Sequence, residues 1–153
     1  MKHALADCIR KVYGTSPFFK ETYYGITHLP AFIGRFKERE RKKLDNTWIL
    51  KPVNAARSSD HVITNNLECI VRHMETVPRI IQKYIENPFT IDNKKIDMRF
   101  WVVVRSFSPL ELYVHKHCYA RIATNEFDNH ETSYMDWSKH FGLEDRETGK
   151  YNL

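Results

Sequence analysis

The chain has 153 residues, 42% of them hydrophobic and 13% aromatic, which excludes intrinsic disorder and predicts one domain or a piece of a larger one. Its three cysteines contain no Cys-x-x-Cys pair, and no window is apolar enough for a secretory signal or a bilayer span, so we expect a cytoplasmic protein without a membrane segment. The net charge of +5 favours an acidic partner, without choosing between nucleic acid, anionic membrane, nucleotide and acidic polypeptide.

The N-terminal part, residues 1–46, is predicted to be mainly helical. Leu5, Ile9 and Val12 stand at helical spacing and predict a short helix that ends near Gly14. After an irregular aromatic stretch, a second helix is predicted over residues 31–44. Charges of both signs alternate along residues 35–43, which is typical of a solvated helix face, and a basic nucleic-acid-binding module is the less favoured alternative.

Residues 47–127 contain the predicted core of the domain. A strand is predicted over residues 48–52, followed by a polar loop over residues 53–60. Apolar residues at helical spacing predict a helix over residues 62–74, with Ser59 or Asp60 as its N-cap. A second strand over residues 79–85 then completes the order strand, helix, strand.

The clearest strand is predicted over residues 95–104. Because side chains alternate across a strand, the even-numbered apolar residues are expected to face the core, and Lys95, Asp97 and Arg99 share the other face. A turn over residues 106–109 leads to an antiparallel strand at residues 110–114, and another short strand follows at 119–123. Residues 128–153 are predicted to be an irregular tail.

Two groups of residues could form a nucleotide site. The charged face of the strand, with Lys51 and Arg121 from flanking strands, offers cations for phosphates and a carboxylate for a ribose hydroxyl, although a solvated strand face is the alternative. The strand end at residues 82–85 could offer backbone donors and acceptors to adenine, and an ordinary strand end is the alternative.

Four segments in order, residues 48–52, 82–88, 95–102 and 120–124, resemble successive motifs of tubulin-tyrosine-ligase-like enzymes, a branch of the ATP-grasp ligases. The resemblance implies an α+β fold with a mostly antiparallel, ATP-grasp-type sheet and flanking helices, here incomplete. It also implies an ATP-dependent ligase that activates a carboxylate as an acyl phosphate and joins an amino acid to tubulin. The expected partner is the acidic tail of tubulin, and association with microtubules would follow.

The resemblance also assigns roles to single residues. Lys51 would reach the ATP phosphates, and Asp97 would lie beside the ribose. Arg99 and Arg121 would act near the phosphates and the acceptor carboxylate as catalytic residues. Four consecutive residues would contact adenine: Gln82, Lys83, Tyr84 and Ile85. Lys95, on the charged strand face, is also expected to bind ATP.

Two departures from the family pattern bear on activity. The loop at residues 52–60 has no glycine, whereas active members place a glycine-containing loop over the phosphates; with residues 135–141 it resembles a divergent family member. No Glu-x-Asn element follows Thr124, so Mg²⁺ is expected from the family but its ligands are not identified. A catalytically inactive protein that binds tubulin or another acidic partner is therefore the alternative. His115, His117 and Cys118 lack the second cluster that a zinc site needs, so no metal site is predicted.

Overall fold

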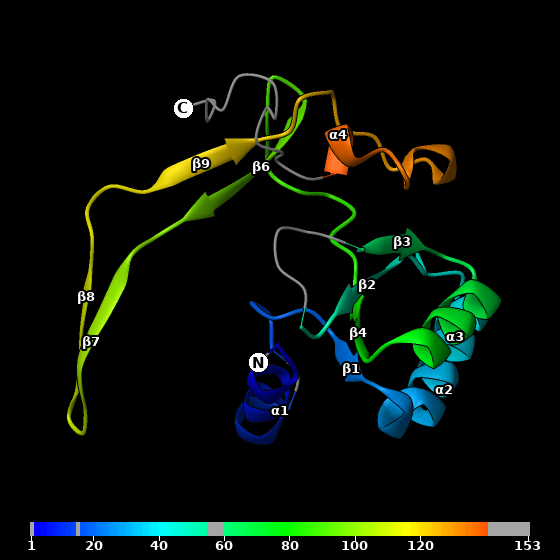
Figure 1. The fold of residues 1–153 in the computed structure, drawn as a ribbon, viewed down its shortest axis with the longest axis horizontal. Helices are drawn as coiled ribbons and strands as arrows, with labels where there is room; N and C mark the ends of the chain where they lie inside the picture. The colour runs from blue at the N-terminus through cyan, green and yellow to red at the C-terminus, as the bar shows by residue number, and fades with distance from the viewer. Residues whose placement is uncertain (1, 15, 55–59, 141–153) are drawn as a thin grey trace. The chain divides into compact units, whose positions relative to one another are not determined.

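The structure is a computed structural model that describes residues 2–14, 16–54 and 60–140. The chain divides into two compact units, Met1–Glu86 with His130–Met135, and Asn87–Asn129 with Asp136–Leu153. Antiparallel strands build the sheets of both units, and helices accompany them (Figure 1). The predicted α+β class with a mostly antiparallel sheet is confirmed.

The first unit contains a four-stranded sheet in the order β1-β4-β2-β3. Its strands are β1 (Thr22–Tyr24), β2 (Trp48–Pro52), β3 (Val62–Thr64) and β4 (Arg79–Lys83). All three neighbouring pairs are antiparallel, and the register places Trp48 opposite Lys83 and Leu50 opposite Ile81. β4 is thus an inner strand, which fixes the direction of each of its side chains.

Helices α2 (Leu29–Arg41) and α3 (Leu67–Thr76) cover one face of this sheet, while α1 (Lys2–Tyr13) lies beside β1 (Figure 1). The rings of Phe32 and Trp48 meet edge to face with centroids 5.0 Å apart. Burying each large side chain of such a core contributes roughly 1.5–3 kcal/mol. The core joins both helices to β2 and β4 through Phe32, Phe36, Trp48, Leu50, Ile70, Met74 and Ile81.

The N-terminal helix has the predicted end. α1 stops at Tyr13, and Gly14 follows with φ +64° and donates its N–H to the Arg10 carbonyl at 2.9 Å. Glycine adopts this left-handed conformation without a steric penalty, so it is a favoured residue after a helix. The second helix starts two residues earlier than predicted, after the short 3-10 turn η1 (Ile26–His28).

The predicted helix over residues 62–74 is wrong at its start. Residues 62–64 are β3, paired with β2, because Val62, Ile63 and Thr64 are β-branched and suit a strand better than a helix. Helix α3 begins at Leu67, and the Asn66 side chain caps it by accepting the Cys69 N–H at 2.9 Å. Asp60 is therefore not the cap, and Ser59 lies outside the described residues.

The second unit contains two small antiparallel sheets. One has the order β5-β6-β9, from β5 (Thr90–Ile91), β6 (Lys94–Arg99) and β9 (Tyr119–Ile122), and the other pairs β7 (Val102–Phe107) with β8 (Leu110–Val114). The single strand predicted over residues 95–104 is thus broken at Phe100 and Trp101. The His115 N–H donates to the Trp101 carbonyl at 2.9 Å, which links the strand ends at this break. The predicted irregular tail contains η2 (Glu131–Ser133) and α4 (Trp137–His140).

The apolar side of this broken strand is not the predicted core face. Met98, Phe100, Val102 and Val104 are exposed to between 43% and 55%. The alternation correctly shows which side chains share a face, but a sequence pattern does not show what covers that face. The core prediction is wrong for these four residues in the described structure.

Candidate functional site

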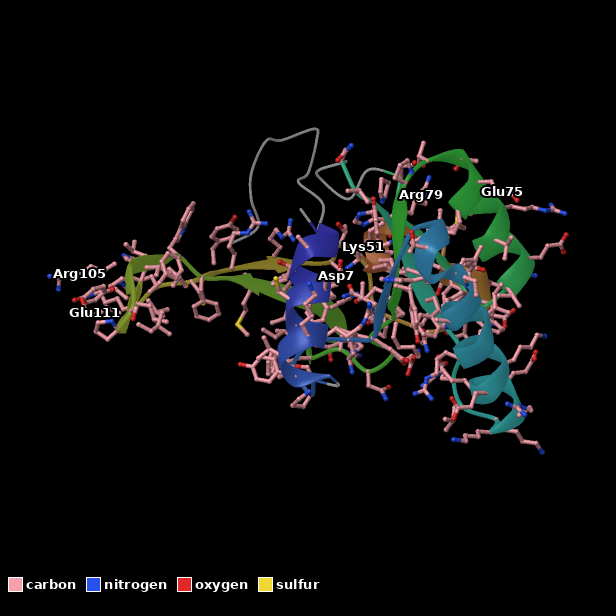
Figure 2. All side chains as sticks on the ribbon, turned by 90° about the horizontal axis from the view of Figure 1, so that it is seen from below. Asp7, Lys51, Glu75, Arg79, Arg105 and Glu111 are labelled. Carbon is pink, nitrogen blue, oxygen red and sulfur yellow. The ribbon has the colours of Figure 1, made fainter. Side chains whose placement is uncertain are left out.

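Lys51 and Gln82 meet on the face of the first sheet that lies opposite α2 and α3. Leu50 and Ile81 point into the helix-covered core, so their strand neighbours Lys51 and Gln82 point to the other face. Both side chains are half-buried, and the Lys51 Nζ donates to the Gln82 Oε1 at 2.6 Å. Figure 2 labels Lys51 among the side chains of the chain. The Gln82 Nε2 donates in turn to the Thr22 Oγ1 at 2.9 Å, which orients the amide.

Lys83 points the opposite way, into the helix-covered side. Its ammonium donates to the Asp45 Oδ1 at 3.0 Å and the Thr47 carbonyl at 2.9 Å, and it forms an ion pair with Glu86. It also lies 5.8 Å from the centre of the Trp48 ring. Burial lowers the pKa of Lys83, an effect that the bond to Asp45 opposes. The Lys83 side chain thus holds the sheet to the segment before β2.

Tyr84 and Ile85 continue the predicted adenine-contacting segment beyond the end of β4. The Tyr84 N–H donates to the Thr47 carbonyl at 3.1 Å, and its side chain is buried. Burial raises the pKa of the Tyr84 phenol. The Ile85 side chain is exposed. The Gln82 side chain contacts another predicted site residue, Lys51.

In the second unit, Asp97 and Arg121 form a two-pronged ion pair between β6 and β9. They are directly opposite in the register, and the Arg121 Nε and Nη2 contact the two Asp97 carboxylate oxygens at 2.8 and 2.7 Å. The hydrogen bonds that Arg121 donates to Asp97 raise the pKa of Arg121. Paired forks of this kind fix both side chains in one orientation.

The two remaining cations of this strand face lie against aromatic rings. The Arg99 guanidinium is 5.7 Å from the centre of the Tyr119 ring, and the Lys95 ammonium is 5.8 Å from that of Phe127. Such cation–π contacts are worth about 0.5–1 kcal/mol at exposed sites. The charged face that the sequence predicted is present, and its members already have partners.

The predicted site residues therefore fall into two groups, one in each unit. Lys51 contacts Gln82 in the first unit, and Asp97 contacts Arg121 in the second. Sequence reasoning missed Thr22, which orients Gln82, and Asp45, which holds Lys83, because neither stands in a recognisable motif. Asp45 comes shortly before a buried stretch and Thr22 is itself buried, and neither signal identifies a partner.

The ends of the loop after β2 are fixed to the start of β4. The Val53 N–H donates to the Pro78 carbonyl at 3.0 Å, and Arg79 donates to the Asp60 carbonyl and to its Oδ2, both at 2.6 Å. Arg79 is buried, whereas Asp60 is exposed. Residues 55–59, the middle of the glycine-free loop, lie outside the described structure.

Some basic residues in and just after α2, which suggested the nucleic-acid alternative, are paired with acids, whereas Arg39 donates to the backbone carbonyl of Asp45. Arg35 contacts Glu21 at 2.9 Å and Glu38 at 2.8 Å, and Lys42 contacts Glu38 at 2.6 Å. The hydrogen bonds from Lys42 and Arg35 lower the pKa of Glu38 to about 2. This arrangement agrees with the predicted solvated helix face.

In the residues that the structure describes, no group of three or more His, Cys, Asp or Glu side chains could hold a metal ion. His115 and His117 contact each other through the His115 ring and the His117 backbone. Likewise, none of the described helices has both the length and the apolar character needed to cross a membrane.

Comparisons with known proteins give one consistent family. The model of the tubulin-tyrosine ligase family matches residues 2–144. Tubulin–tyrosine ligase-like protein 12 of Mus musculus is 38% identical over 148 residues, which are 92% of this chain and 23% of the relative. The protein of the same name from Caenorhabditis elegans is 35% identical over 147 residues, 92% of this chain and 22% of the relative.

The chain is also similar, over a shorter stretch, to a protein with another name. Tubulin glycylase 3C of Tetrahymena thermophila is 37% identical over 86 residues, 55% of this chain and 8% of the relative. The chain spans less than a quarter of the length of the curated relatives that it matches most fully. Protein 12 is also the divergent family member that residues 52–60 and 135–141 resemble, so that prediction is confirmed.

Proposed function

Because this chain belongs to the tubulin-tyrosine ligase family, we propose that it carries part of the ATP-binding apparatus of a tubulin-modifying ligase. The observation that carries the proposal is the contact between Lys51 and Gln82 on the face of the sheet not covered by α2 and α3. A lysine ammonium on a strand beside a loop can reach a phosphate, and a neighbouring amide can orient it.

Within the first unit, Lys51 would supply positive charge to the phosphates of ATP. The bond to Gln82 holds the ammonium within the sheet face, so the lysine is already ordered before a nucleotide binds. Pre-ordering of this kind reduces the entropy lost on binding. Residues 82–85 would contact the adenine ring, with Gln82 rather than Lys83 directing its side chain to the Lys51 side.

Within the second unit, Asp97 would accept a hydrogen bond from a ribose hydroxyl group. Arg99 and Arg121 would stabilise the negative charge of the phosphates or of the acceptor carboxylate. Lys95 would add a further cation on the same strand face. The present partners of these residues must then be exchanged on binding: Arg121 would release one Asp97 oxygen, and Arg99 would leave the Tyr119 ring. Each such contact is exposed and weak enough to be exchanged.

The reaction proposed from the family is the formation of an acyl phosphate from a carboxylate and ATP, with release of ADP. Attack by an amino group then expels phosphate and forms the amide bond. Cations around the phosphates lower the energy of the charge that develops during transfer. The family uses Mg²⁺ with ATP in general, but the described residues offer no cluster that fits this ion, so we assign it no ligands.

Calorimetric titration of the 153-residue chain with ATP and Mg²⁺ tests the proposal. Binding should be weakened about tenfold or more in Lys51→Met, because a charge-assisted contact to phosphate is lost. Lys37→Met is the matched control, since Lys37 is an exposed lysine of the same unit that pairs with Glu40. Absence of detectable ATP binding by the unmodified chain would reject the ligase proposal for this chain.

A second candidate is a catalytically inactive protein that keeps the fold and binds tubulin or another acidic partner. The glycine-free loop at residues 52–60 favours it, because every residue there carries a Cβ where close backbone approach to phosphates would be needed. A chain that binds tubulin but not ATP would support this candidate. Binding to tubulin that lacks its acidic tail should then be weaker than binding to intact tubulin. This difference should be larger at low salt, where charge attraction is less screened.

Either candidate places the chain in the cytoplasm, with tubulin as the proposed partner and microtubules as the proposed site of action. The net charge of +5 supports an acidic partner such as the tubulin tail. Co-sedimentation with microtubules, with and without their acidic tails, measures this directly. We propose nucleic acid as neither substrate nor partner, since Arg35, Lys37 and Lys42 are held by acidic side chains.

A further inference from the structure

Thr22 faces Gln82 across the first sheet, directly opposite in the register of β1 and β4. The Lys83 N–H donates to the Glu21 carbonyl at 2.8 Å, which makes these two residues a backbone-hydrogen-bonded pair. Such pairs alternate with non-hydrogen-bonded pairs along antiparallel strands, so Thr22 and Gln82 form a non-hydrogen-bonded pair, whose side chains lie closer together. The register thus brings the Thr22 hydroxyl to the Gln82 amide, at 2.9 Å.

The hydroxyl proton of Thr22 is already used in another hydrogen bond. The Thr22 Oγ1 donates to the Lys20 carbonyl at 2.7 Å. A carbonyl oxygen can only accept and a hydroxyl has one proton, so toward Gln82 the Thr22 oxygen can act only as an acceptor. The end of the amide that faces Thr22 must therefore be the NH2 group, in agreement with the contact from Gln82 Nε2. Thr22 is buried, so water has little access to its hydroxyl.

The orientation of the amide decides which of its ends faces Lys51. With Nε2 turned to Thr22, the Gln82 Oε1 accepts the hydrogen bond of the Lys51 ammonium at 2.6 Å. An ammonium group can only donate, so an amide turned by about 180° would set its NH2 group against the ammonium and its oxygen against the Thr22 oxygen. Both hydrogen bonds would be lost in that orientation. The hydrogen bonds therefore run in one direction, from the Lys51 ammonium to the main chain before β1.

The backbone of Thr22 is held from its other side by α1. β1 is an edge strand, and at a non-hydrogen-bonded position its carbonyl points away from β4. The Arg10 guanidinium donates to this carbonyl and lies 6.0 Å from the centre of the Tyr23 ring. Thr22 is thus anchored through its backbone and its hydroxyl, and an anchored residue can orient the more exposed amide of Gln82 beside it.

We propose that Thr22 is a positioning residue for the Lys51 ammonium, and that it acts by fixing the orientation of the Gln82 amide. The consequence for ATP rests on the proposed function, in which Lys51 supplies charge to the phosphates. Thr22 acts without touching the nucleotide, because it keeps an acceptor oxygen, instead of a second donor, beside the lysine. A lysine held in this way before ATP binds loses less entropy on binding.

Two substitutions separate the Thr22 hydroxyl from the rest of the side chain. Thr22→Val keeps the β-branched shape and the strand preference but removes the acceptor of the Gln82 Nε2 bond. Thr22→Ser keeps the hydroxyl and loses only the methyl group. Thr90→Val is the control, because Thr90 is a strand residue of the other unit. Should circular dichroism show Thr22→Val to be unfolded, Thr22→Ala removes the same acceptor without placing a second methyl group at the buried site.

The first measurement uses no ligand. Gln82 is the one glutamine in the sequence, so labelling glutamine side chains with ¹⁵N gives a single pair of amide proton signals in the NMR spectrum of the 153-residue chain. In Thr22→Val the Nε2 proton that is bonded to Thr22 should exchange with water about threefold faster or more, because its hydrogen bond is lost. In Thr22→Ser the rate should stay close to that of the unmodified chain. Equal rates in Thr22→Val and the unmodified chain would overturn the proposal.

The second measurement is calorimetric titration with ATP and Mg²⁺. Thr22→Val should bind ATP about three- to tenfold more weakly than the unmodified chain, and Thr22→Ser and Thr90→Val should stay within about twofold of it. Unchanged affinity in Thr22→Val, or a serine variant as weak as the valine variant, would overturn the proposal, because the hydroxyl would then not position the lysine. If the unmodified chain binds no ATP, the proposed function is rejected, whereas the exchange rates still decide whether Thr22 orients the amide beside Lys51.

Discussion

Arg121 contacts both carboxylate oxygens of Asp97, at 2.8 and 2.7 Å, from the directly opposite position on the neighbouring strand. Their side chains remain 36% and 48% exposed, respectively. Water screens an ion pair at this exposure, so its contribution to folding is small although its geometry is well defined. A residue pair that is ordered but adds little stability is available for exchange with a ligand.

Asp97→Asn should therefore separate structure from function. We expect the free energy of unfolding to change by less than about 1 kcal/mol, because the pair is exposed. ATP affinity should fall about tenfold, since an amide oxygen accepts a weaker hydrogen bond from a ribose hydroxyl group than a carboxylate oxygen does. Urea denaturation and calorimetry measure the two quantities. Unchanged affinity would mean that Asp97 does not contact the nucleotide.

Asp45 and Lys83 should differ in their effect on stability. Asp45→Ala leaves the buried Lys83 ammonium without one of its two carboxylate partners and is expected to destabilise the protein by about 2 kcal/mol. Lys83→Met removes the buried charge together with its cation–π contact to Trp48 and leaves an apolar side chain of similar length, so its cost should be about 1 kcal/mol or less. Urea denaturation of both variants measures which one loses more free energy of unfolding. A larger loss in Lys83→Met than in Asp45→Ala would contradict this account.

The cap of α3 gives a local test of the fold. Asn66→Ala removes the acceptor of the Cys69 N–H and should lower the free energy of unfolding by about 1 kcal/mol. Asn66→Asp keeps an acceptor at the same position and should cost little or nothing. Thermal unfolding of the two variants measures the difference. Equal loss in both would show that the side-chain oxygen is not what stabilises this helix start.

Stability should fall in alkaline solution because of buried phenols. Burial raises the pKa of Tyr23, Tyr84 and Tyr134 above the ordinary value of 10.0. Above pH 10 the unfolded chain therefore loses protons that the folded chain keeps. The stabilisation that the buried phenols give the folded state is thus complete below pH 10 and is lost as pH rises further. Lys83 acts in the opposite direction, because its lowered pKa makes folding more favourable as pH rises toward 10.5.

Tyr84→Phe isolates the phenol contribution. This variant removes one raised pKa, so its free energy of unfolding should decline less steeply between pH 10 and 11 than that of the unmodified chain. Tyr113→Phe is the control, because Tyr113 is exposed. Urea titrations at a series of pH values measure the slopes. Identical slopes for Tyr84→Phe and the unmodified chain would contradict the assigned role of burial.

Much of the first unit could be predicted because its signals are local. The helix end at Gly14 and the strand at Trp48–Pro52 depend on a few neighbouring residues, and both are confirmed. The start of α3 could not be placed, because Ile63 fits the helical spacing of the residues that follow and also has a strand preference. Pairing with β2, a contact between distant residues, decides between them.

The candidate site was predictable in its residue types and less so in its contacts. Alternation placed Lys95, Asp97 and Arg99 on one strand face, and the structure has that face. It could not show that Lys83 turns into the core while Gln82 reaches Lys51, because the direction of each side chain depends on which face the helices cover. The exposure of the β7–β8 hairpin likewise depends on packing that no local pattern specifies.

Gln82 and Lys83 are neighbours in the chain, yet β4 directs one to Lys51 and the other to Asp45. A strand that serves two faces in this way cannot tolerate a change of length. Deleting one residue within Arg79–Lys83 would exchange the faces, placing an amide in the core and an ammonium beside Lys51. Length variation among related chains should therefore fall in the turns on either side of β4 and never within it.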